Sequence, residues 1–226
     1  MIKAVLFDLD GTLIDTLHLY LQTYFKTMEH FPEVELLDMK QMEALNPTSE
    51  YRALEKLVGE KLAEKAFNIF LDNYNRMHAE LFQGTFPGVV SMLEILREKG
   101  FLLGIVTGKS RPAWEITSTQ VNLGEFDVVI TDNEVRHPKP HPDGLAEAMR
   151  LLEIPQAEAQ KVVYVGDSMN DLFAAKEAGI KFAAATWSYW AKTDEFLSWL
   201  EKKEEYFAIL EVTADLIDYL DNEPVS

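Results

Sequence analysis

Five short, mainly apolar stretches without apolar/polar alternation limit the folds that are open to this chain. They cover residues 2–7, 101–107, 126–131, 161–167 and 181–186. Such continuous runs are typical of strands in a parallel sheet that helices cover on both faces. Helical patterns lie at 89–99, 112–123, 142–152 and 169–178, and Gly100 and Gly179 stand where C-caps are expected. The alternation predicts an α/β fold with a doubly wound, mainly parallel sheet and right-handed crossovers.

The segment 15–83 interrupts this alternation. It contains no convincing strand, and stretches at 17–31, 49–58 and 61–82 have helical spacing. About 70 residues are far more than a crossover needs. We therefore predict an inserted all-helical cap at 15–83 on a core made of 1–14 and 84–226, with hinges at 11–15 and 83–88. A single domain with one elaborate helical layer is the alternative.

Composition narrows the classes of partner. The chain has 226 residues, a formal net charge of -17 and no cysteine. The charge argues against duplex nucleic acid or a membrane surface, which are both polyanions. The lack of cysteine excludes disulfides and thiolate metal sites, and it fits a reducing compartment. With no apolar run long enough for a span, we expect a cytoplasmic protein, monomeric or homodimeric.

Polar residues follow four of the five predicted strands. Ligands of open α/β sheets bind beyond the carboxyl ends of the strands, so these residues would face one crevice. Taken singly, each could also be a turn former, a helix cap or a solvated loop residue. The residues are Asp8, Asp10, Thr107, Gly108, Lys109, Lys139, Asp167 and Asp171.

The close carboxylates of the stretch "AVLFDLDGTLID" point to a cation. Asp8 and Asp10 are two residues apart, and Asp167 adds a third carboxylate if its strand lies beside the first. Such carboxylates share a proton unless a cation intervenes. Mg²⁺ fits, because it takes one or two carboxylates together with substrate phosphate. An EF-hand is excluded, since the twelfth residue from Asp8 is Leu19 rather than Glu.

The ordered set of motifs resembles the haloacid dehalogenase-like (HAD) hydrolase superfamily. The motifs are Asp8-x-Asp10-Gly11-Thr12, Thr107-Gly108, Lys139-Pro140 and Gly166-Asp167-x-x-x-Asp171. The resemblance covers roughly residues 1–187, and the helical insert is similar to the small α-helical cap of the phosphoglycolate phosphatase and β-phosphoglucomutase-like branch. Ser188 departs from the pattern, because relatives often carry glycine there.

The resemblance implies a role for each matching residue. Asp8 would be the nucleophile, Asp10 the general acid and base, and Asp171 an outer residue that steers Lys139 or a metal-bound water. Mg²⁺ would be held by Asp8, Asp167 and the backbone carbonyl of Asp10. The transferred phosphate would be held by Leu9, Gly11, Thr107, Gly108 and Lys139.

Asp10 points to the reaction class, because dehalogenases of this superfamily lack an acid there. We expect a Mg²⁺-dependent phosphatase acting on a small phosphorylated metabolite through an aspartyl-phosphate. A phosphosugar mutase, a pyrophosphatase and a catalytically idle phosphate- or metal-binding protein remain open. Polar cap candidates for substrate contact are His18, Asn46, Tyr51 and Arg52; Arg52 could bind a second anionic group of the substrate, but an ordinary surface arginine is the favoured interpretation. The tail 192–226 is expected to be helical, with Phe196, Trp199, Leu200 and Phe207 covering the sheet.

Overall fold

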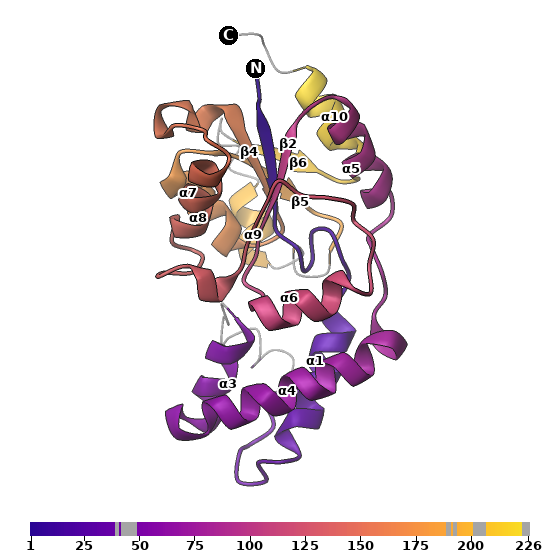
Figure 1. Ribbon diagram of the computed structural model, residues 1–226, viewed down its shortest axis with the longest axis vertical. Helices are drawn as coiled ribbons and strands as arrows, with labels where there is room; N and C mark the ends of the chain where they lie inside the picture. The colour runs from indigo at the N-terminus through magenta and orange to yellow at the C-terminus, as the bar shows by residue number, and fades with distance from the viewer. Residues whose placement is uncertain (39–40, 42–48, 189–190, 192–193, 201–206, 223–226) are drawn as a thin grey trace.

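A six-stranded, all-parallel sheet forms the centre of the molecule. It is seen in a computed structural model that describes residues 1–38, 41, 49–188, 191, 194–200 and 207–222 (Figure 1). The strands are β1 (Ala4–Phe7), β2 (Leu102–Val106), β3 (Val128–Ile130), β4 (Val162–Gly166), β5 (Lys181–Ala185) and β6 (Phe207–Leu210). Five of them fall inside the five apolar runs, which confirms the predicted α/β sheet.

The strand order marks the middle of the sheet as the expected position of a ligand site. The order is β3-β2-β1-β4-β5-β6. The chain adds β2 and β3 on one side of β1 and then crosses to the other side, where it adds β4, β5 and β6, so the order of strand addition reverses between β1 and β4. The two strands pair in register from Ala4 with Val162 to Phe7 with Val165. Ligands of such sheets bind beyond the carboxyl ends of the strands at this reversal. Asp8 and Asp167 directly follow the two strands concerned.

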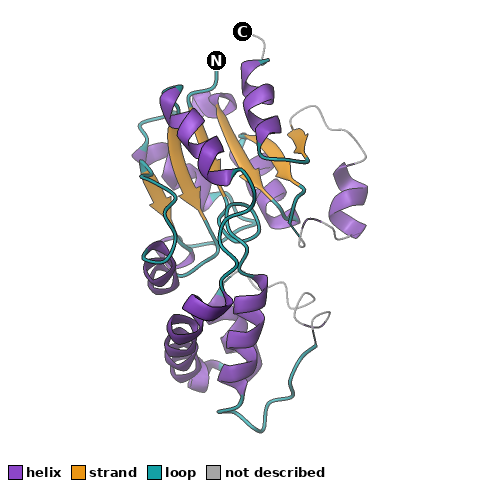
Figure 2. Cartoon of the chain, turned by 90° about the vertical axis from the view of Figure 1, so that its right-hand side faces the viewer, coloured by secondary structure: helices purple, strands orange, loops and turns teal. Residues whose placement is uncertain are grey.

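Helices cover both faces of the sheet (Figures 1 and 2). One apolar cluster joins the sheet to α7, α8 and α9, and a second joins its other face to α5 and α10. Burial on both faces explains why the strands are continuously apolar. The bounds are α5 (Val89–Glu98), α6 (Arg111–Ser118), α7 (Asp143–Leu151), α8 (Met169–Ala178), α9 (Asp194–Leu200) and α10 (Ala214–Asp221), with 3₁₀ turns η1 (Asp132–Glu134) and η2 (Gln156–Lys161).

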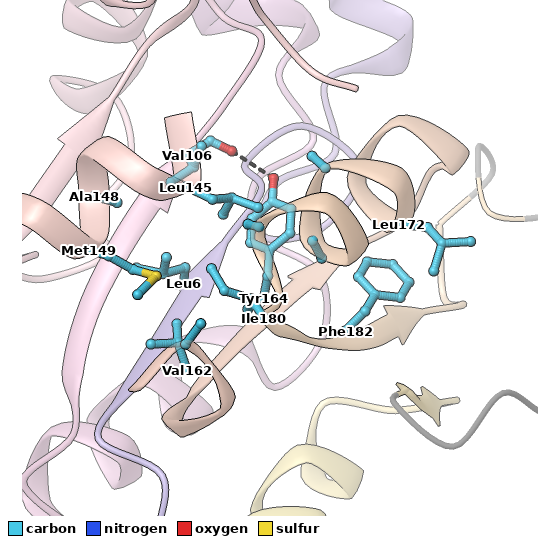
Figure 3. Packing of buried hydrophobic residues seen from close by; sticks show 14 of the residues in the cluster. Leu6, Val106, Leu145, Ala148, Met149, Val162, Tyr164, Leu172, Ile180 and Phe182 are labelled. Carbon is cyan, nitrogen blue, oxygen red and sulfur yellow. Dashed lines mark hydrogen bonds between the residues drawn. The ribbon is translucent and has the colours of Figure 1, made fainter. Parts of the chain in front are cut away.

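Tyr164 places a polar group inside the first of these clusters. Its ring lies among Leu6, Leu145 and Ile180 (Figure 3), and the residue is fully buried. Its hydroxyl lies 2.8 Å from the carbonyl oxygen of Val106, the last residue of β2. A buried phenol needs such a partner. The tyrosine thereby carries a hydroxyl from the apolar core to the edge where the strands end.

Three helices of the segment 15–83 pack together beyond that edge, at the bottom of Figure 1. They are α1 (Leu17–Met28), α3 (Glu50–Val58) and α4 (Glu60–Leu81). They share a cluster of their own around Leu19, Phe70 and Tyr74, to which α6 adds Ala113. Ser49 caps α3 by accepting the N–H of Arg52. These helices confirm the predicted helical character of the segment, although α1 ends at Met28 and the described residues that follow it up to 38 form turns and loop.

Two expectations about elements are wrong. The tail is not all helical, because β6 pairs in parallel with β5 and extends the sheet at its edge. Its four residues are too few to stand out beside the acidic stretch that precedes them. The helix expected at 112–123 ends at Ser118, where the hydroxyl of Thr119 donates to the carbonyl of Ile116. Such side-chain bonds compete with helical ones.

Other expectations for the tail are confirmed. Phe196 and Leu200 are buried against the sheet, and Trp199 packs beside them. The side chain of Phe207 lies outside the description.

Gly179 ends α8 in the left-handed conformation, with φ of 72°, as expected for a C-cap. Among the helices described, none combines the length and the apolar character that a membrane span requires.

Candidate active site

The turn after β1 brings two carboxylates to the edge of the sheet. The N–H of Asp8 continues the ladder by donating to Val165 at 2.8 Å, and its side chain is buried. Asp10 lies in the next turn, and its Oδ1 accepts the hydroxyl of Thr16 at 2.6 Å. The turn is closed by N–H groups of Leu13 and Ile14, which both donate to the carbonyl of Leu9. These backbone bonds define the turn that carries Asp10 past the end of β1.

Gly11 has a steric role in this turn. Its φ is +86°, and a Cβ added there would lie 2.1 Å from Oδ2 of Asp167. Only glycine allows the carboxylate to come so close. The Gly11 N–H, which the motifs predict to contact the substrate phosphate, donates in this structure to the carbonyl of Ile14 at 2.9 Å.

The end of β4 supplies two further carboxylates. Asp167 receives hydrogen bonds from Thr12 at 3.3 Å and from Ser188 at 2.6 Å. Asp171 closes a capping box at the start of α8, since it accepts the N–H and hydroxyl of Ser168. The capping box at the start of α8 therefore fixes the orientation of the Asp171 carboxylate at this edge of the sheet. Ser188, which stands in place of the expected glycine, is a direct hydrogen-bonding partner of Asp167.

Lys139 connects the carboxylate that follows β1 with the carboxylate in the first turn of α8. Its Nζ lies 2.9 Å from Oδ1 of Asp8, 2.6 Å from Oδ1 of Asp171 and 3.0 Å from the hydroxyl of Tyr164. Burial alone would lower the pKa of Lys139, but the charges of Asp171 and Asp8 outweigh it and raise that pKa. The lysine is therefore charged at neutral pH, and it offsets part of the negative charge of the crevice.

One ammonium does not neutralise three buried carboxylates. Asp8, Asp167 and Asp171 offer oxygens that lie within 4.8 Å of one another. Burial raises the pKa of Asp8 to about 7, although Lys139 acts to lower it, and burial with the charges of Asp171 and Asp8 raises the pKa of Asp167 well above its ordinary value. Carboxylates forced so close favour a cation. This donor set of hard oxygens fits a divalent metal ion.

The end of β2 supplies Thr107 and Gly108, as predicted. Thr107 is buried, its N–H donates to Ile130 at 3.0 Å, and its Oγ1 accepts the N–H of Lys109 at 3.1 Å. The strand ends of β1, β2 and β4 are adjacent in the sheet, so the residues expected at this edge come together there.

Lys109 belongs to the same site, although sequence reasoning did not assign it a role. Its side chain is fully buried, and its Nζ lies 3.1 Å from Oδ1 of Asp10. It also contacts the hydroxyls of Tyr20 and Tyr74, which come from α1 and α4. Burial would lower the pKa of Lys109, but the charge of Asp10 together with Tyr74 and Glu50 outweighs burial and raises it. The signal in the sequence was a lysine two residues after Thr107 at a strand end.

The cap candidates fall in different places. Arg52 lies at the boundary with the core, where its Nε is 3.5 Å from Oδ2 of the buried Asp132 and its side chain is 43% exposed. His18 is exposed, and Tyr51 packs edge-on against Phe67 on the helical segment. Asn46 lies outside the described residues. Arg52 is thus the cap candidate whose contact with the core the structure describes.

Sequence comparison identifies relatives along nearly the whole chain. The family model described as haloacid dehalogenase-like hydrolase matches residues 5–185. A protein named pyrophosphatase PpaX from Anoxybacillus flavithermus is 31% identical over 224 residues, covering 94% of this chain and 99% of its own. Another of that name from Bacillus velezensis is 33% identical, covering 83% of this chain and 84% of its own.

Solved structures share the fold. CbbY from Rhodobacter sphaeroides in complex with phosphate superposes with a TM-score of 0.81 at 24% identity, covering 96% of each chain. A mutant of that protein in complex with xylulose-(1,5)bisphosphate has a TM-score of 0.80 at 23% identity, with the same coverage. The resemblance seen in the motifs is therefore confirmed by sequence and by fold. The chain belongs to the haloacid dehalogenase-like hydrolase family.

Proposed function

We propose that this protein is a Mg²⁺-dependent phosphatase that forms an aspartyl-phosphate on Asp8. One observation carries the proposal: the buried Asp8 carboxylate lies 2.9 Å from the Lys139 ammonium, in a cluster of carboxylates at the reversal point of the sheet. Phosphoryl transfer needs an in-line nucleophile and positive charge around the phosphoryl oxygens. The pyrophosphatase name of the PpaX relatives and the phosphate bound by CbbY support a phosphoryl-transfer reaction.

The site holds the metal through its own oxygens in this proposal. Asp8 and Asp167 supply carboxylates, and the backbone carbonyl of Asp10 supplies a third oxygen. When bound, Mg²⁺ offsets negative charge on the carboxylates and on the transferred phosphoryl group. Hard oxygen donors favour Mg²⁺ over softer metals. The raised pKa values of Asp8 and Asp167 without a cation support this assignment.

The reaction follows from the side chains. A carboxylate oxygen of Asp8 forms a bond to phosphorus as the bond to the leaving oxygen breaks, and that oxygen takes the electron pair and a proton from Asp10. Asp10, now ionised, takes a proton from water as the water oxygen attacks phosphorus and releases Asp8 and inorganic phosphate. Lys139, Thr107 and the amides of Leu9 and Gly108 hold the phosphoryl oxygens.

We assign the remaining residues to support this chemistry. Asp171 orients Lys139, which it contacts at 2.6 Å. The segment 15–83 is the cap over a core of 1–14 and 84–226, and Arg52 at their boundary is the candidate contact for the leaving group. The substrate is a small phosphorylated metabolite rather than nucleic acid or a membrane, in keeping with the charge of -17, and the enzyme acts in the cytoplasm as a monomer or homodimer.

Pyrophosphatase activity is the second candidate, because the PpaX relatives carry that name at 31% and 33% identity. A panel of pyrophosphate, phosphoglycolate and sugar phosphates separates the two. Preferred release of phosphate from a carbon ester favours the metabolite phosphatase, and preferred cleavage of pyrophosphate favours the second candidate. Interconversion of sugar 1- and 6-phosphates identifies a mutase instead.

The nucleophile is tested by Asp8→Asn, which keeps the shape of the side chain and removes its charge. Wild type is expected to release p-nitrophenolate from p-nitrophenyl phosphate when Mg²⁺ is present, and Asp8→Asn is expected to lose at least about 1,000-fold in kcat. Asp143→Asn, in an exposed cluster with two histidines, is the matched control and keeps wild-type activity. Equal activity of Asp8→Asn and wild type would overturn the proposal.

The metal assignment is tested separately with Asp167→Asn. Because a hard cation loses a charged ligand, the Mg²⁺ concentration that gives half-maximal activity should rise about tenfold or more. Ser188→Ala removes one hydrogen bond to the same carboxylate at 2.6 Å and should produce a smaller rise. An unchanged half-saturating concentration in Asp167→Asn contradicts the assignment.

A further inference from the structure

Lys109 is a buried core residue that contacts two helices of the inserted segment at the site. Its Nζ lies 3.1 Å from Asp10 and 3.1 Å from the hydroxyl of Tyr74, and it donates to the hydroxyl of Tyr20. The ammonium also lies over both rings, 4.4 Å from the centroid of Tyr20 and 5.0 Å from that of Tyr74. An ammonium has three N–H donors. All three have an oxygen here, and two of these oxygens come from the cap.

The contacts continue through the cap and return to the core. Tyr20 donates its hydroxyl proton to Oε1 of Glu50 at 2.6 Å. The other oxygen of Glu50 accepts the N–H of Ser110 at 2.9 Å. Glu50 is itself buried, with 3% of its surface exposed. The contacts therefore form a loop from Lys109 through Tyr20 and Glu50 to Ser110, which follows Lys109 in the chain, and Asp10 is attached to this loop through Lys109.

Asp10 is held by one of its two oxygens. The hydroxyl of Thr16 and the ammonium of Lys109 both contact Oδ1, at 2.6 Å and 3.1 Å. Oδ2 takes part in neither of these contacts. If the cap moved away, Lys109 would keep its contact with Asp10 but lose its contacts with the hydroxyls of Tyr20 and Tyr74. A buried ammonium that loses its partners is costly, so the position of the lysine depends on the cap.

We propose that Lys109 is a positioning residue that couples docking of the cap to the orientation of the Asp10 carboxyl. With Tyr20 and Tyr74 in place, the ammonium fixes Oδ1, and Oδ2 is aligned with the leaving oxygen. Without them, the ammonium loses two of its three partners and holds Oδ1 of Asp10 less firmly. Lys109 transfers no proton and touches no reacting atom. The inference rests on the proposed function, since it needs Asp10 as the general acid.

The test compares two substrates of similar shape. Phenyl phosphate has a poorer leaving group than p-nitrophenyl phosphate, so its first step depends more on the acid. Lys109→Met should lower kcat/KM for phenyl phosphate about tenfold more than for p-nitrophenyl phosphate. Tyr20→Phe should change the ratio of kcat/KM between the two substrates in the same direction by a smaller factor. Lys109→Arg, which keeps the positive charge, should bring this ratio part of the way back to the wild-type value.

Tyr24→Phe is the matched control. Tyr24 is a buried cap tyrosine whose ring packs 5.1 Å from that of Phe70, and it has no described contact with Lys109. The control should keep the wild-type ratio of the two substrates. If Lys109→Met does not fold, as judged by thermal melting, the Tyr20→Phe ratio decides the matter.

The outcomes separate the two levels of the proposal. If Lys109→Met and Tyr20→Phe lower kcat/KM equally for both substrates, the lysine is only structural and the inference is overturned. If Asp8→Asn keeps wild-type turnover, the proposed function itself fails. A change in the substrate ratio together with an inactive Asp8→Asn supports both.

Discussion

The ammonium of Lys139 is held by oxygens from three different segments. Asp8 follows β1, Tyr164 lies in β4 and Asp171 lies in the first turn of α8, and their oxygens are 2.9, 3.0 and 2.6 Å from Nζ. The lysine itself comes from the loop after β3. Its placement therefore depends on the fold rather than on local sequence. An ammonium held so rigidly stabilises developing charge without reorganising.

Replacing this ammonium should slow the reaction strongly. Lys139→Met keeps most of the stem and removes the charge, so kcat should fall by about 100-fold or more. Lys161→Met is the control, because Lys161 is a surface lysine paired with Glu158, and it should keep wild-type activity. Steady-state kinetics at saturating Mg²⁺ gives the comparison. Near-normal turnover in Lys139→Met would show that the ammonium takes no part in the reaction and that Lys139 is an ordinary loop residue.

At the scale of one element, α4 buries a histidine without hydrogen bonds. His78 is 0% exposed, and neither ring nitrogen has a partner among the described residues. It lies between the rings of Tyr74 and Phe82, at centroid distances of 5.3 and 4.6 Å. Burial, together with the charge of Lys109, lowers the pKa of His78 from 6.5 to about 4. The imidazole is therefore neutral in the folded protein at physiological pH.

This histidine should make the fold sensitive to acid. Between pH 6.5 and about 4 the unfolded chain binds a proton that the folded chain does not, so stability falls as the pH falls through this window. The loss attributable to His78 reaches about 3 kcal/mol near pH 4. His78→Leu should flatten this part of the curve of unfolding free energy against pH, measured by urea denaturation.

An exposed histidine on the same unit provides the control for that measurement. His18→Leu changes the chain by the same substitution at the surface, and it should keep the wild-type loss of stability in acid. If His78→Leu and wild type lose stability in parallel between pH 6.5 and 4, other groups account for the acid sensitivity.

At the scale of the whole molecule, two adjacent connections join the sheet domain to the cap helices (Figure 2). The N–H of Asp15 donates to the carbonyl of Gly84 at 2.9 Å, and the N–H of Phe86 donates to that of Leu13 at 3.1 Å. Gly84 and Gly88 have φ of 89° and 81°. Two short paired segments with left-handed glycines are a suitable hinge.

Movement about this hinge should be visible by proteolysis. We expect chymotrypsin to cleave after Phe82 in the free protein, and cleavage to slow several-fold when Mg²⁺ and a metallofluoride mimic of phosphate hold the cap closed. Mg²⁺ without fluoride is the control and should give less protection. Equal cleavage rates under all conditions would count against a moving cap.

The sequence alone determined the sheet and most of the chemistry at its edge. Continuous apolar runs require burial on both faces, so the parallel sheet follows from local pattern. Asp8, Thr107 and Asp167 each directly follow a strand, and the topology rule then brings them together. The roles implied by the motifs needed no tertiary contact. The short edge strand β6 escaped because four apolar residues carry too little periodic signal.

Tertiary structure decided the contacts between the sheet and the cap. Lys109, Tyr20 and Tyr74 meet although the lysine is 89 residues from one tyrosine and 35 from the other. No local pattern shows that a lysine will be buried, because its burial depends on acceptors that other segments bring. The same holds for Ser188, whose hydroxyl reaches Asp167 from 21 residues away. Periodicity reports which face of an element is buried, whereas the partner of a buried polar group is set only when the elements pack.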